Sequence, residues 1–188
     1  MATAWDKTEA RSRLRRMRSS AYVPAVPGVV SALLAHERLA SAVIVASYIS
    51  YGDEVPTAAL HAALGTQRVV VPAPGPRGCD LTWTWLDSVA PQPAHVAARR
   101  GEAGAALRGG ELASIGVVVV PGIAFATDGG RLGQGGGWYD RALSALPQAW
   151  KIGLSWDATL VEHLPTQAHD VAMDAVCTPE RGIILTDR

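Results

Sequence analysis

Residues 42–72 read AVIVASYISYGDEVPTAALHAALGTQRVVVP, and this stretch decides the fold. Its first five residues form an apolar run whose length and β-branched content are typical of a strand buried on both faces. A turn follows, then a short helix that Thr57 can cap and Gly65 closes, and then a second strand over residues 68–72. Strand, helix and strand within about 30 residues form a βαβ unit, which predicts a parallel sheet.

The segments on either side of this unit extend the same pattern. Periodicity and composition predict helices over residues 6–22, 28–40, 94–107 and 137–146. Apolar runs predict strands over residues 81–85, 115–120, 151–156, 175–178 and 182–186. The first of these strands alternates in the way that an edge or antiparallel strand does, and residues 121–137 are expected to form a long loop. Together they predict one α/β domain over residues 1–188.

The composition excludes several classes of protein. Of the 188 residues, 48% are hydrophobic and 18% charged, which excludes intrinsic disorder as a description of the whole chain. Seventeen basic residues balance 17 acidic ones, so bulk charge does not favour nucleic-acid binding. The apolar runs are far shorter than the ~20 residues that cross a bilayer, and the charged N-terminal segment lacks the apolar run of a secretory signal. Cys79 and Cys177 have no metal-ligand spacing and are interpreted as thiols of a reduced cytoplasm. We expect a cytoplasmic monomer that binds neither nucleic acid nor a membrane.

Residues 129–141 read GGRLGQGGGWYDR, follow a predicted strand and open a predicted helix. Glycines let backbone N–H groups turn toward one point, and a helix N-terminus adds partial positive charge. Arg131 and Arg141 flank the loop with guanidinium groups suited to phosphate oxygens. The glycine spacing matches neither the dinucleotide-binding fingerprint nor a P-loop. We interpret the segment as an anion cradle, and a flexible surface turn is the alternative that glycine spacing alone leaves open.

Other charged residues are candidates for the same site. Lys7 and Arg11 lie four residues apart and share one face of the first predicted helix, which is either solvated or presented to a nucleotide phosphate. Asp140 either favours the N-terminus of its helix or binds Mg²⁺ beside phosphates. Asp174, which precedes a C-terminal strand, is a second candidate ligand.

Glu54 lies in the turn that follows the first strand of the βαβ unit. It either stabilises the next helix N-terminus or accepts hydrogen bonds from a polar heterocycle, with Ile49 and nearby aromatic residues as flat apolar walls. His169 and Asp170 have the residue types of a catalytic dyad, but no serine or cysteine context supports that role. We interpret this pair as a structural turn.

Taken together, these residues resemble the 5-formyltetrahydrofolate cyclo-ligase family, also called 5,10-methenyltetrahydrofolate synthetases. The similarity covers nearly the whole chain, through the segments KTEAR (7–11), YISYGDE (48–54), VPGIAF (120–125), RLGQGGGWYDR (131–141), LP (164–165), HD (169–170) and MDAV (173–176). The glycine-rich block is the most specific of these segments. Two positions depart from the family pattern: Ala126 stands where aspartate is usual, and Trp138 replaces the commoner tyrosine.

The resemblance implies an activity, a fold and a set of site residues. The activity is the ATP-driven cyclisation of 5-formyltetrahydrofolate to 5,10-methenyltetrahydrofolate, with release of ADP and phosphate, and the fold is a single-domain three-layer α/β/α sandwich with a mostly parallel sheet. ATP is the implied co-substrate and Mg²⁺ the implied metal. The positions matching the family's ATP contacts are Lys7, Arg11, Arg131, Leu132, Gly133, Gln134, Gly135, Gly136, Gly137, Trp138, Tyr139 and Arg141. The positions matching its folate contacts are Ile49, Glu54, Gln134, Gly135, Gly136, Gly137 and Trp138, and those matching its magnesium ligands are Asp140 and Asp174.

The chemistry of this reaction favours cations over a general base. The formyl oxygen is a poor leaving group, but it departs as phosphate once it has accepted the γ-phosphoryl group of ATP and N10 has attacked the formyl carbon. Phosphoryl transfer depends mainly on positioning and charge neutralisation, so Lys7, Arg11 and Arg131 are the expected catalytic residues. Two alternatives stay open: a phosphate-binding isomerase or transferase on a related fold, and a non-catalytic folate or nucleotide sensor.

Overall fold

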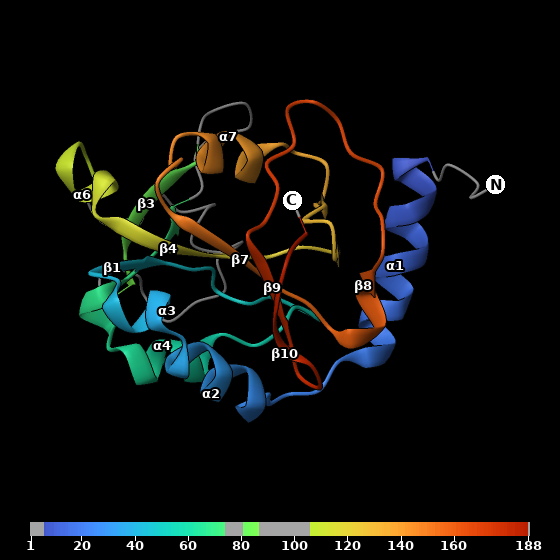
Figure 1. Ribbon diagram of the computed structural model, residues 1–188, viewed down its shortest axis with the longest axis horizontal. Coiled ribbons are helices and arrows are strands. Elements are labelled where there is room, and N and C mark those ends of the chain that lie inside the picture. Colours follow the sequence, from blue (N-terminus) through green and yellow to red (C-terminus); the bar gives the residue numbers. More distant parts are fainter. Residues whose placement is uncertain (1–5, 74–80, 87–105, 188) are drawn as a thin grey trace.

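The computed structural model describes residues 6–73, 81–86 and 106–187. Its centre is a seven-stranded sheet with the order β10-β9-β7-β4-β1-β2-β3 (Figure 1). The strands are β1 (Ile44–Ala46), β2 (Val69–Ala73), β3 (Thr82–Trp85), β4 (Ile115–Val120), β7 (Trp150–Leu154), β9 (Ala175–Thr178) and β10 (Gly182–Leu185). The inner strands run parallel, and β3 and β10 pair antiparallel at the two edges. This mostly parallel sheet confirms the predicted α/β class.

The βαβ unit that decides the fold is present as predicted. β1 and β2 pair in parallel, and α4 (Ala58–Leu64) connects them and ends at Gly65, which has a φ of 78°. Thr57 occupies the N-cap position, but it does not cap the helix. Its hydroxyl donates instead to the carbonyl oxygen of Tyr48 at 2.7 Å. β4, the centre of the sheet, is buried at every residue except Gly116, which explains its continuous apolar sequence.

Helices pack against both faces of this sheet (Figure 1). On one face, apolar side chains of α2 (Pro27–Ala35), α3 (Glu37–Ser41) and α4 pack with those of the strands. α7 (Trp138–Ser144) packs on the other face, and α6 (Gly110–Ala113) precedes β4. The single helix predicted over residues 28–40 is wrong, because His36 takes an extended conformation that separates α2 from α3. No helix in the described parts of the chain is long and apolar enough to cross a membrane.

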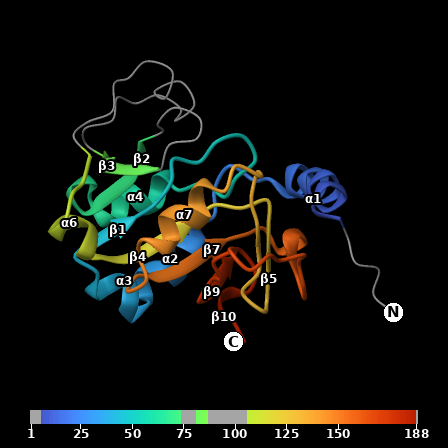
Figure 2. The same cartoon turned by 90° about the horizontal axis from the view of Figure 1, so that it is seen from above.

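A second sheet lies beside the first and was not expected. It has the order β6-β5-β8 and consists of β5 (Ala124–Ala126), β6 (Arg131–Leu132) and β8 (Leu160–Val161). The long loop predicted over residues 121–137 is therefore wrong: its apolar start pairs with its own later part and with a distant segment. α1 (Lys7–Ala21) packs on this small sheet through Ala10 and Leu14, and Figure 2 shows α1 at one end of the molecule, next to β5.

Two further predictions concern residues outside the described ranges. Most of the helix predicted over residues 94–107 lies there, and so does Cys79. Two short 3₁₀ helices, η1 (Thr66–Arg68) and η3 (Asp157–Thr159), complete the described elements.

Candidate functional site

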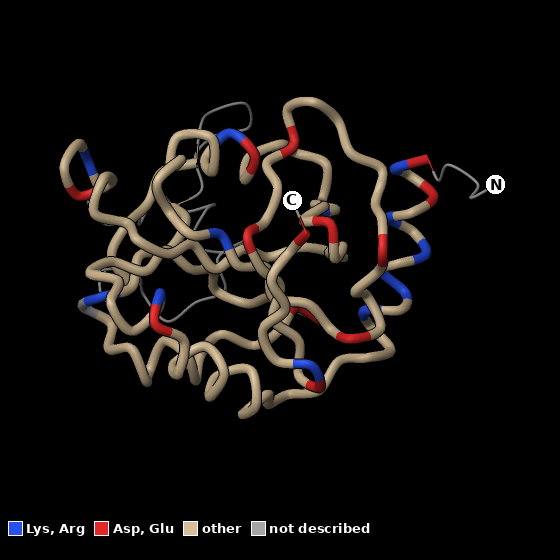
Figure 3. The backbone as a smooth tube through the Cα atoms, in the orientation of Figure 1, with Lys and Arg blue, Asp and Glu red and all other residues tan. Residues whose placement is uncertain are grey.

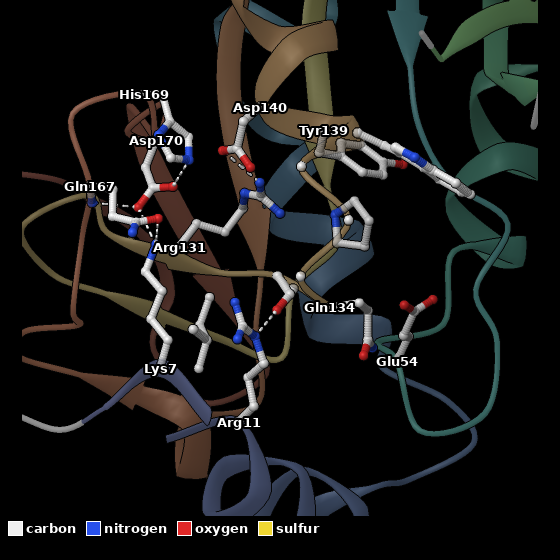
Figure 4. Close-up of a pocket in the computed structure, with 18 residues that line it drawn as sticks. Lys7, Arg11, Glu54, Arg131, Gln134, Tyr139, Asp140, Gln167, His169 and Asp170 are labelled. Atoms are coloured by element: carbon white, nitrogen blue, oxygen red, sulfur yellow. Dashed lines mark hydrogen bonds and ion pairs between the residues drawn. The ribbon is translucent and has the colours of Figure 1, made fainter. Parts of the chain in front are cut away.

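A cavity of about 680 Å³ opens beyond the carboxyl ends of β1 and β4. This is the edge where open α/β sheets bind ligands. Five parts of the chain meet there: α1, the turn after β1, the turn after β4, the glycine-rich segment that opens α7, and the loop before β9 (Figure 4). The lining residues are Lys7, Arg11, Glu54, Pro121, Gly122, Arg131, Leu132, Gly133, Gln134, Gly135, Gly136, Gly137, Trp138, Tyr139, Asp140, Gln167, His169 and Asp170.

α1 carries a row of cations, two of which, Lys7 and Arg11, line this cavity. Basic residues run along the whole helix, which is visible in Figure 3. Spacings of four residues place Lys7, Arg11 and Arg15 on one face. Arg11 Nε donates to the carbonyl oxygen of Gly133 at 3.0 Å, and Arg15 Nη2 donates to Gln134 Oε1 at 2.6 Å. α1 and the glycine-rich segment are therefore tied together at one wall of the cavity.

Glycine is required in this wall for two separate reasons. Gly135 and Gly137 have φ values of 101° and 65°, a region that side-chain-bearing residues rarely adopt. Gly133 has no such φ, but a Cβ atom added there would lie 2.8 Å from Arg131 Nη1. At Gly133 the segment therefore passes close to the Arg131 guanidinium.

Arg131 lies at the centre of the site. Its side chain is only 5% exposed, and its Nη2 forms an ion pair with Asp140 Oδ1 at 2.8 Å. Its guanidinium carbon lies 5.8 Å from the centre of the Tyr139 ring. Arg131 Nε and the Tyr139 hydroxyl are both buried without a hydrogen-bond partner among the described residues. Because unsatisfied buried donors are costly, they are groups that a bound ligand would complete.

Glu54 stands apart from the cations, on the other side of the cavity (Figure 4). Its carboxylate accepts a hydrogen bond from the backbone N–H of Tyr51 at 3.0 Å. Burial raises the pKa of Glu54 above its usual value and outweighs the Tyr51 N–H and the Arg18 guanidinium, which lower it. A half-buried carboxyl of this kind is suited to a polar heterocycle.

The loop before β9 brings residues that the sequence did not single out for binding. Lys7 Nζ donates to Asp170 Oδ2 at 2.8 Å and to Gln167 Oε1 at 3.2 Å. Partial burial raises the pKa of Asp170, but hydrogen bonds from Lys7 and from the Gln167 N–H outweigh it and hold the pKa below its usual value. His169 Nε2 lies 3.7 Å from Asp170 Oδ1. The turn that was predicted from this pair is present, since Gln167 N donates to Asp170 Oδ2 at 2.7 Å, and it also lines the cavity.

The structure brings most of the predicted site residues together, but not three of them. Ile49, Arg141 and Asp174 are not among the residues that line the cavity. The carboxylate of Asp174, which directly precedes β9, accepts a hydrogen bond from the backbone N–H of Lys151 at 2.7 Å. Among the described residues, no three His, Cys, Asp or Glu side chains are grouped to hold a metal ion.

Five lining residues were not predicted: Pro121, Gly122, Gln167, His169 and Asp170. Pro121 and Gly122 follow β4 directly, so the rule that ligands bind beyond strand ends was a usable signal for them. The other three lie in the loop that follows β8 of the small sheet, and the sequence indicated this loop only through the His169–Asp170 pair, which was interpreted as a structural turn.

Comparisons with known proteins agree on one family. The model of the 5-formyltetrahydrofolate cyclo-ligase family matches residues 5–179. A 5-formyltetrahydrofolate cyclo-ligase of Mycolicibacterium smegmatis is 45% identical over 69 residues, which are 36% of this chain and 36% of that protein. One from Escherichia coli K12 is 40% identical over 76 residues, or 37% of this chain and 40% of that protein. The aligned part thus spans less than half the length of these curated relatives.

Two solved structures share the fold over almost their full length. The 5,10-methenyltetrahydrofolate synthetase of Aquifex aeolicus superposes with a TM-score of 0.74 at 23% identity, covering 97% of this chain and 94% of that one. The synthetase of Mycoplasma pneumoniae gives a TM-score of 0.66 at 18% identity, covering 92% of this chain and 98% of that one. At this level of identity the two comparisons concern the fold alone.

Proposed function

The chain belongs to the 5-formyltetrahydrofolate cyclo-ligase family, and on this premise we propose that it cyclises 5-formyltetrahydrofolate to 5,10-methenyltetrahydrofolate at the expense of ATP. The products are the methenyl compound, ADP and phosphate. One observation carries the proposal: a buried guanidinium, that of Arg131, lies in the cavity with an Nε–H that has no acceptor among the described residues. Such a donor is suited to a phosphate oxygen.

The phosphate groups would occupy the end of the cavity that holds the cations. Lys7, Arg11 and Arg131 converge there from two elements that are far apart in the sequence. Three positive charges in a partly enclosed cavity neutralise a triphosphate more strongly than they would in open water. A phosphate group at this end could also approach the backbone of the glycine-rich segment closely, because its glycines carry no side chains to block it.

The reduced pterin would occupy the opposite end. Glu54 would accept hydrogen bonds from the amino and ring N–H groups of the heterocycle, and the Trp138 ring, 36% exposed at the lining, offers it an apolar face. The formyl group on N5 would then face the terminal phosphate between the two ends.

A magnesium ion fits the donors that the cavity offers, provided that the nucleotide supplies further ligands. Mg²⁺ is usually held by one or two carboxylates together with phosphate oxygens and water. Asp140 lines the cavity beside Arg131 and would hold the ion, whereas Asp174 does not line it. When bound, the ion would supply positive charge that neutralises the phosphate oxygens.

The reaction then needs positioning more than proton transfer. The formyl oxygen attacks the γ-phosphorus and ADP leaves, which gives an iminium carbon bearing a phosphate group. N10 attacks this carbon, the C–O bond breaks with its electron pair leaving on phosphate, and the N10 proton passes to solvent. Arg131, Lys7 and Arg11 would hold the transferred group in line, and alignment of this kind is worth about 7–11 kcal/mol of barrier.

The test is a direct assay of purified protein with 5-formyltetrahydrofolate and MgATP. We expect the near-ultraviolet absorbance of the methenyl product to rise only when ATP is present, with one ADP formed per turnover. Arg131→Ala should lower the rate by about 100-fold or more with the fold intact, as expected for removal of a group that stabilises transition-state charge. The matched control is Arg181→Ala, because Arg181 is exposed and lies outside the cavity.

Other results would contradict the proposal. Turnover without ATP would favour a phosphate-binding isomerase or transferase. Binding of both ligands without turnover would indicate a sensor. Rates for Arg131→Ala close to those of the unchanged protein at saturating ATP would show that this guanidinium does not hold the phosphate.

A further inference from the structure

We propose that Arg18 and Asp53 form a positioning pair that fixes the Glu54 turn to α1 and so sets the folate end of the cavity relative to its phosphate end. This inference rests on the proposed function, because it assigns the folate to Glu54. Neither Arg18 nor Asp53 lines the cavity. Their effect on the ligand must therefore pass through the residues that they hold.

Arg18 is a buried cation that joins three elements. It is only 8% exposed, near the end of α1. Its Nη2 forms an ion pair with the Asp53 carboxylate, and its Nη1 donates to the carbonyl oxygen of Gly122 at 3.0 Å. Asp53 directly precedes Glu54, and Gly122 lines the cavity in the turn after β4. One guanidinium thus fixes α1, the Glu54 turn and the β4 turn in a single arrangement.

Asp53 is held at more than one point. Its carboxylate also accepts from the Ser19 hydroxyl, and its backbone carbonyl oxygen accepts from Trp156 Nε1 at 2.8 Å. The Glu54 N–H then donates to the carbonyl oxygen of Tyr51 at 3.2 Å, which closes the turn. Side chains of α1 and of the segment after β7 therefore fix the position of Asp53, and with it the position of Glu54, the next residue.

α1 connects this pair to the phosphate end. Lys7 and Arg18 are separated by eleven residues, which corresponds to roughly 16 Å along a helix at 1.5 Å per residue. Lys7 is held by the loop before β9, and Arg11 by the glycine-rich segment. The helix therefore acts as a spacer with independent attachments at its two ends, and loss of the Arg18 attachment should affect the folate end first.

The charges of the pair act on Glu54 in opposite directions. Burial is the main reason that the Glu54 pKa is raised; Arg18 lowers this pKa and Asp53 raises it. In the described parts of the chain, the other titratable groups that interact with Glu54 are Tyr48 and Tyr139, both buried with raised pKa values and so neutral across the usual pH range. Changes at Arg18 and Asp53 should therefore move the titration of Glu54 in opposite directions.

The experiment measures equilibrium binding of 5-formyltetrahydrofolate and, separately, of MgATP, to the full chain. Binding is used because it reports on the pair whether or not the protein turns over. We expect Arg18→Gln and Asp53→Asn each to weaken folate binding by about tenfold or more. For comparison, a 1 Å displacement of a positioning group can lower a reaction rate by about 100-fold. MgATP binding should change less than about twofold, since Lys7 and Arg11 keep their attachments. Arg18→Lys should recover part of the loss, because it keeps the charge but not the fork that reaches two acceptors.

The pH dependence separates positioning from simple damage to the fold. Protonation of Glu54 removes an acceptor, so folate binding falls on the acid side. Arg18→Gln should move this fall to higher pH, and Asp53→Asn should move it to lower pH. Loss of structure alone would shift the pH of this fall in the same direction in both variants. Arg16→Gln is the matched control, because Arg16 lies on α1 and, among the described residues, its side chain bonds only to Ser12 of the same helix.

Three outcomes would overturn the inference: folate binding by Arg18→Gln that equals that of the unchanged protein, an equal loss of folate and MgATP binding, or pH profiles that move together. Thermal unfolding identifies a variant that does not fold, in which case Arg18→Lys and Asp53→Asn carry the test. Absence of ATP-dependent turnover in the unchanged protein would count against the proposed function alone, because the two binding measurements remain possible.

Discussion

Gly133→Ala offers a way to displace Arg131 without removing any charge. The added Cβ atom would lie 2.8 Å from Arg131 Nη1, whereas ordinary contacts begin at 3.4 Å. The guanidinium would therefore have to move by about 0.6 Å or turn away. Nη1 is the end of a flexible side chain, so the backbone of the glycine-rich segment need not change. The substitution should alter the position of one cation and little else.

The size of the effect follows from the geometry of the ion pair. Arg131 Nη2 lies 2.8 Å from Asp140 Oδ1, and a shift of this guanidinium lengthens or misaligns that contact and the bond expected to phosphate. A 1 Å displacement of a positioning group costs up to about 100-fold in rate. For the smaller shift we expect roughly a tenfold loss of kcat/KM for MgATP, or about 1.4 kcal/mol. Stability should fall by about 1 kcal/mol, because the clash is with the end of a side chain and not with backbone.

The assay compares three alanine variants by ATP-dependent product formation and by urea unfolding. Gly136→Ala lies in the same segment, but its Cβ atom would only reach ordinary contact with the Trp138 ring at 3.8 Å, so its effect should be smaller. Gly110→Ala in α6 meets no atom of the described residues within 4 Å and should leave the rate unchanged. The reasoning would be refuted if Gly133→Ala kept full activity, or if it lost activity only in proportion to a loss of folded protein.

Three further predictions test other parts of the molecule. Asp170→Asn should weaken MgATP binding by roughly tenfold, about 1.4 kcal/mol, by releasing Lys7, and folate binding measured in parallel should not change. Burial lowers the pKa of His61 to about 4 from 6.5, so its neutral form contributes stability above pH 6.5 that is lost as pH falls toward 4. Between pH 6.5 and pH 4, urea unfolding should show a fall of up to about 3 kcal/mol in the free energy of unfolding, and this fall should be smaller in His61→Gln. Gly153→Ala would place a Cβ atom 2.3 Å from the Phe125 ring, and should cost about 1–3 kcal/mol of unfolding free energy; an unchanged value would contradict the packing described.

The central sheet could be predicted because each of its inner strands is encoded locally. β4 is a run of β-branched residues that is buried on both faces, and β1 and β2 are separated by one short helix. Where local signals competed, the prediction was wrong. The apolar residues on both sides of His36 favour one helix, but His36 is extended and its side chain accepts from the Arg38 N–H, starting a second helix.

The small sheet could not be predicted because its strands are short and one of them, β8, is distant in sequence from the other two. β5 pairs with β8, and Phe125 faces Leu160 across this pairing. β6 has only two residues, Arg131 and Leu132, and a strand of that length has no periodicity to detect. Pairing of this kind depends on tertiary contacts and not on the local pattern.

The same distinction applies to the candidate site. The glycine-rich segment could be found because its residues lie together in the sequence and reach one cavity wall together. Gln167 and Asp170 reach that cavity from another loop, whose His169–Asp170 pair was interpreted as a structural turn, and their place at the site is shown by the bonds that they make to Lys7. Asp174 carries the residue type of a metal ligand, but its carboxylate is bonded to the Lys151 N–H, a partner that no sequence pattern indicates.

The position of the small sheet explains why a helix that is so rich in arginine is attached to the core. Among the described residues, no strand of the main sheet contributes a residue to the cavity lining, so the positive charge that a triphosphate would require has to come from outside the main sheet. α1 supplies part of that charge with one face. Its apolar residues Ala10 and Leu14, which are 1% and 0% exposed, pack against the small sheet and hold the helix in place. Because β6 of that sheet also contains Arg131, the surface on which α1 packs and the central guanidinium of the site belong to the same small sheet. The pairing that was hardest to predict is thus the one that brings the cations of two distant segments to the same cavity.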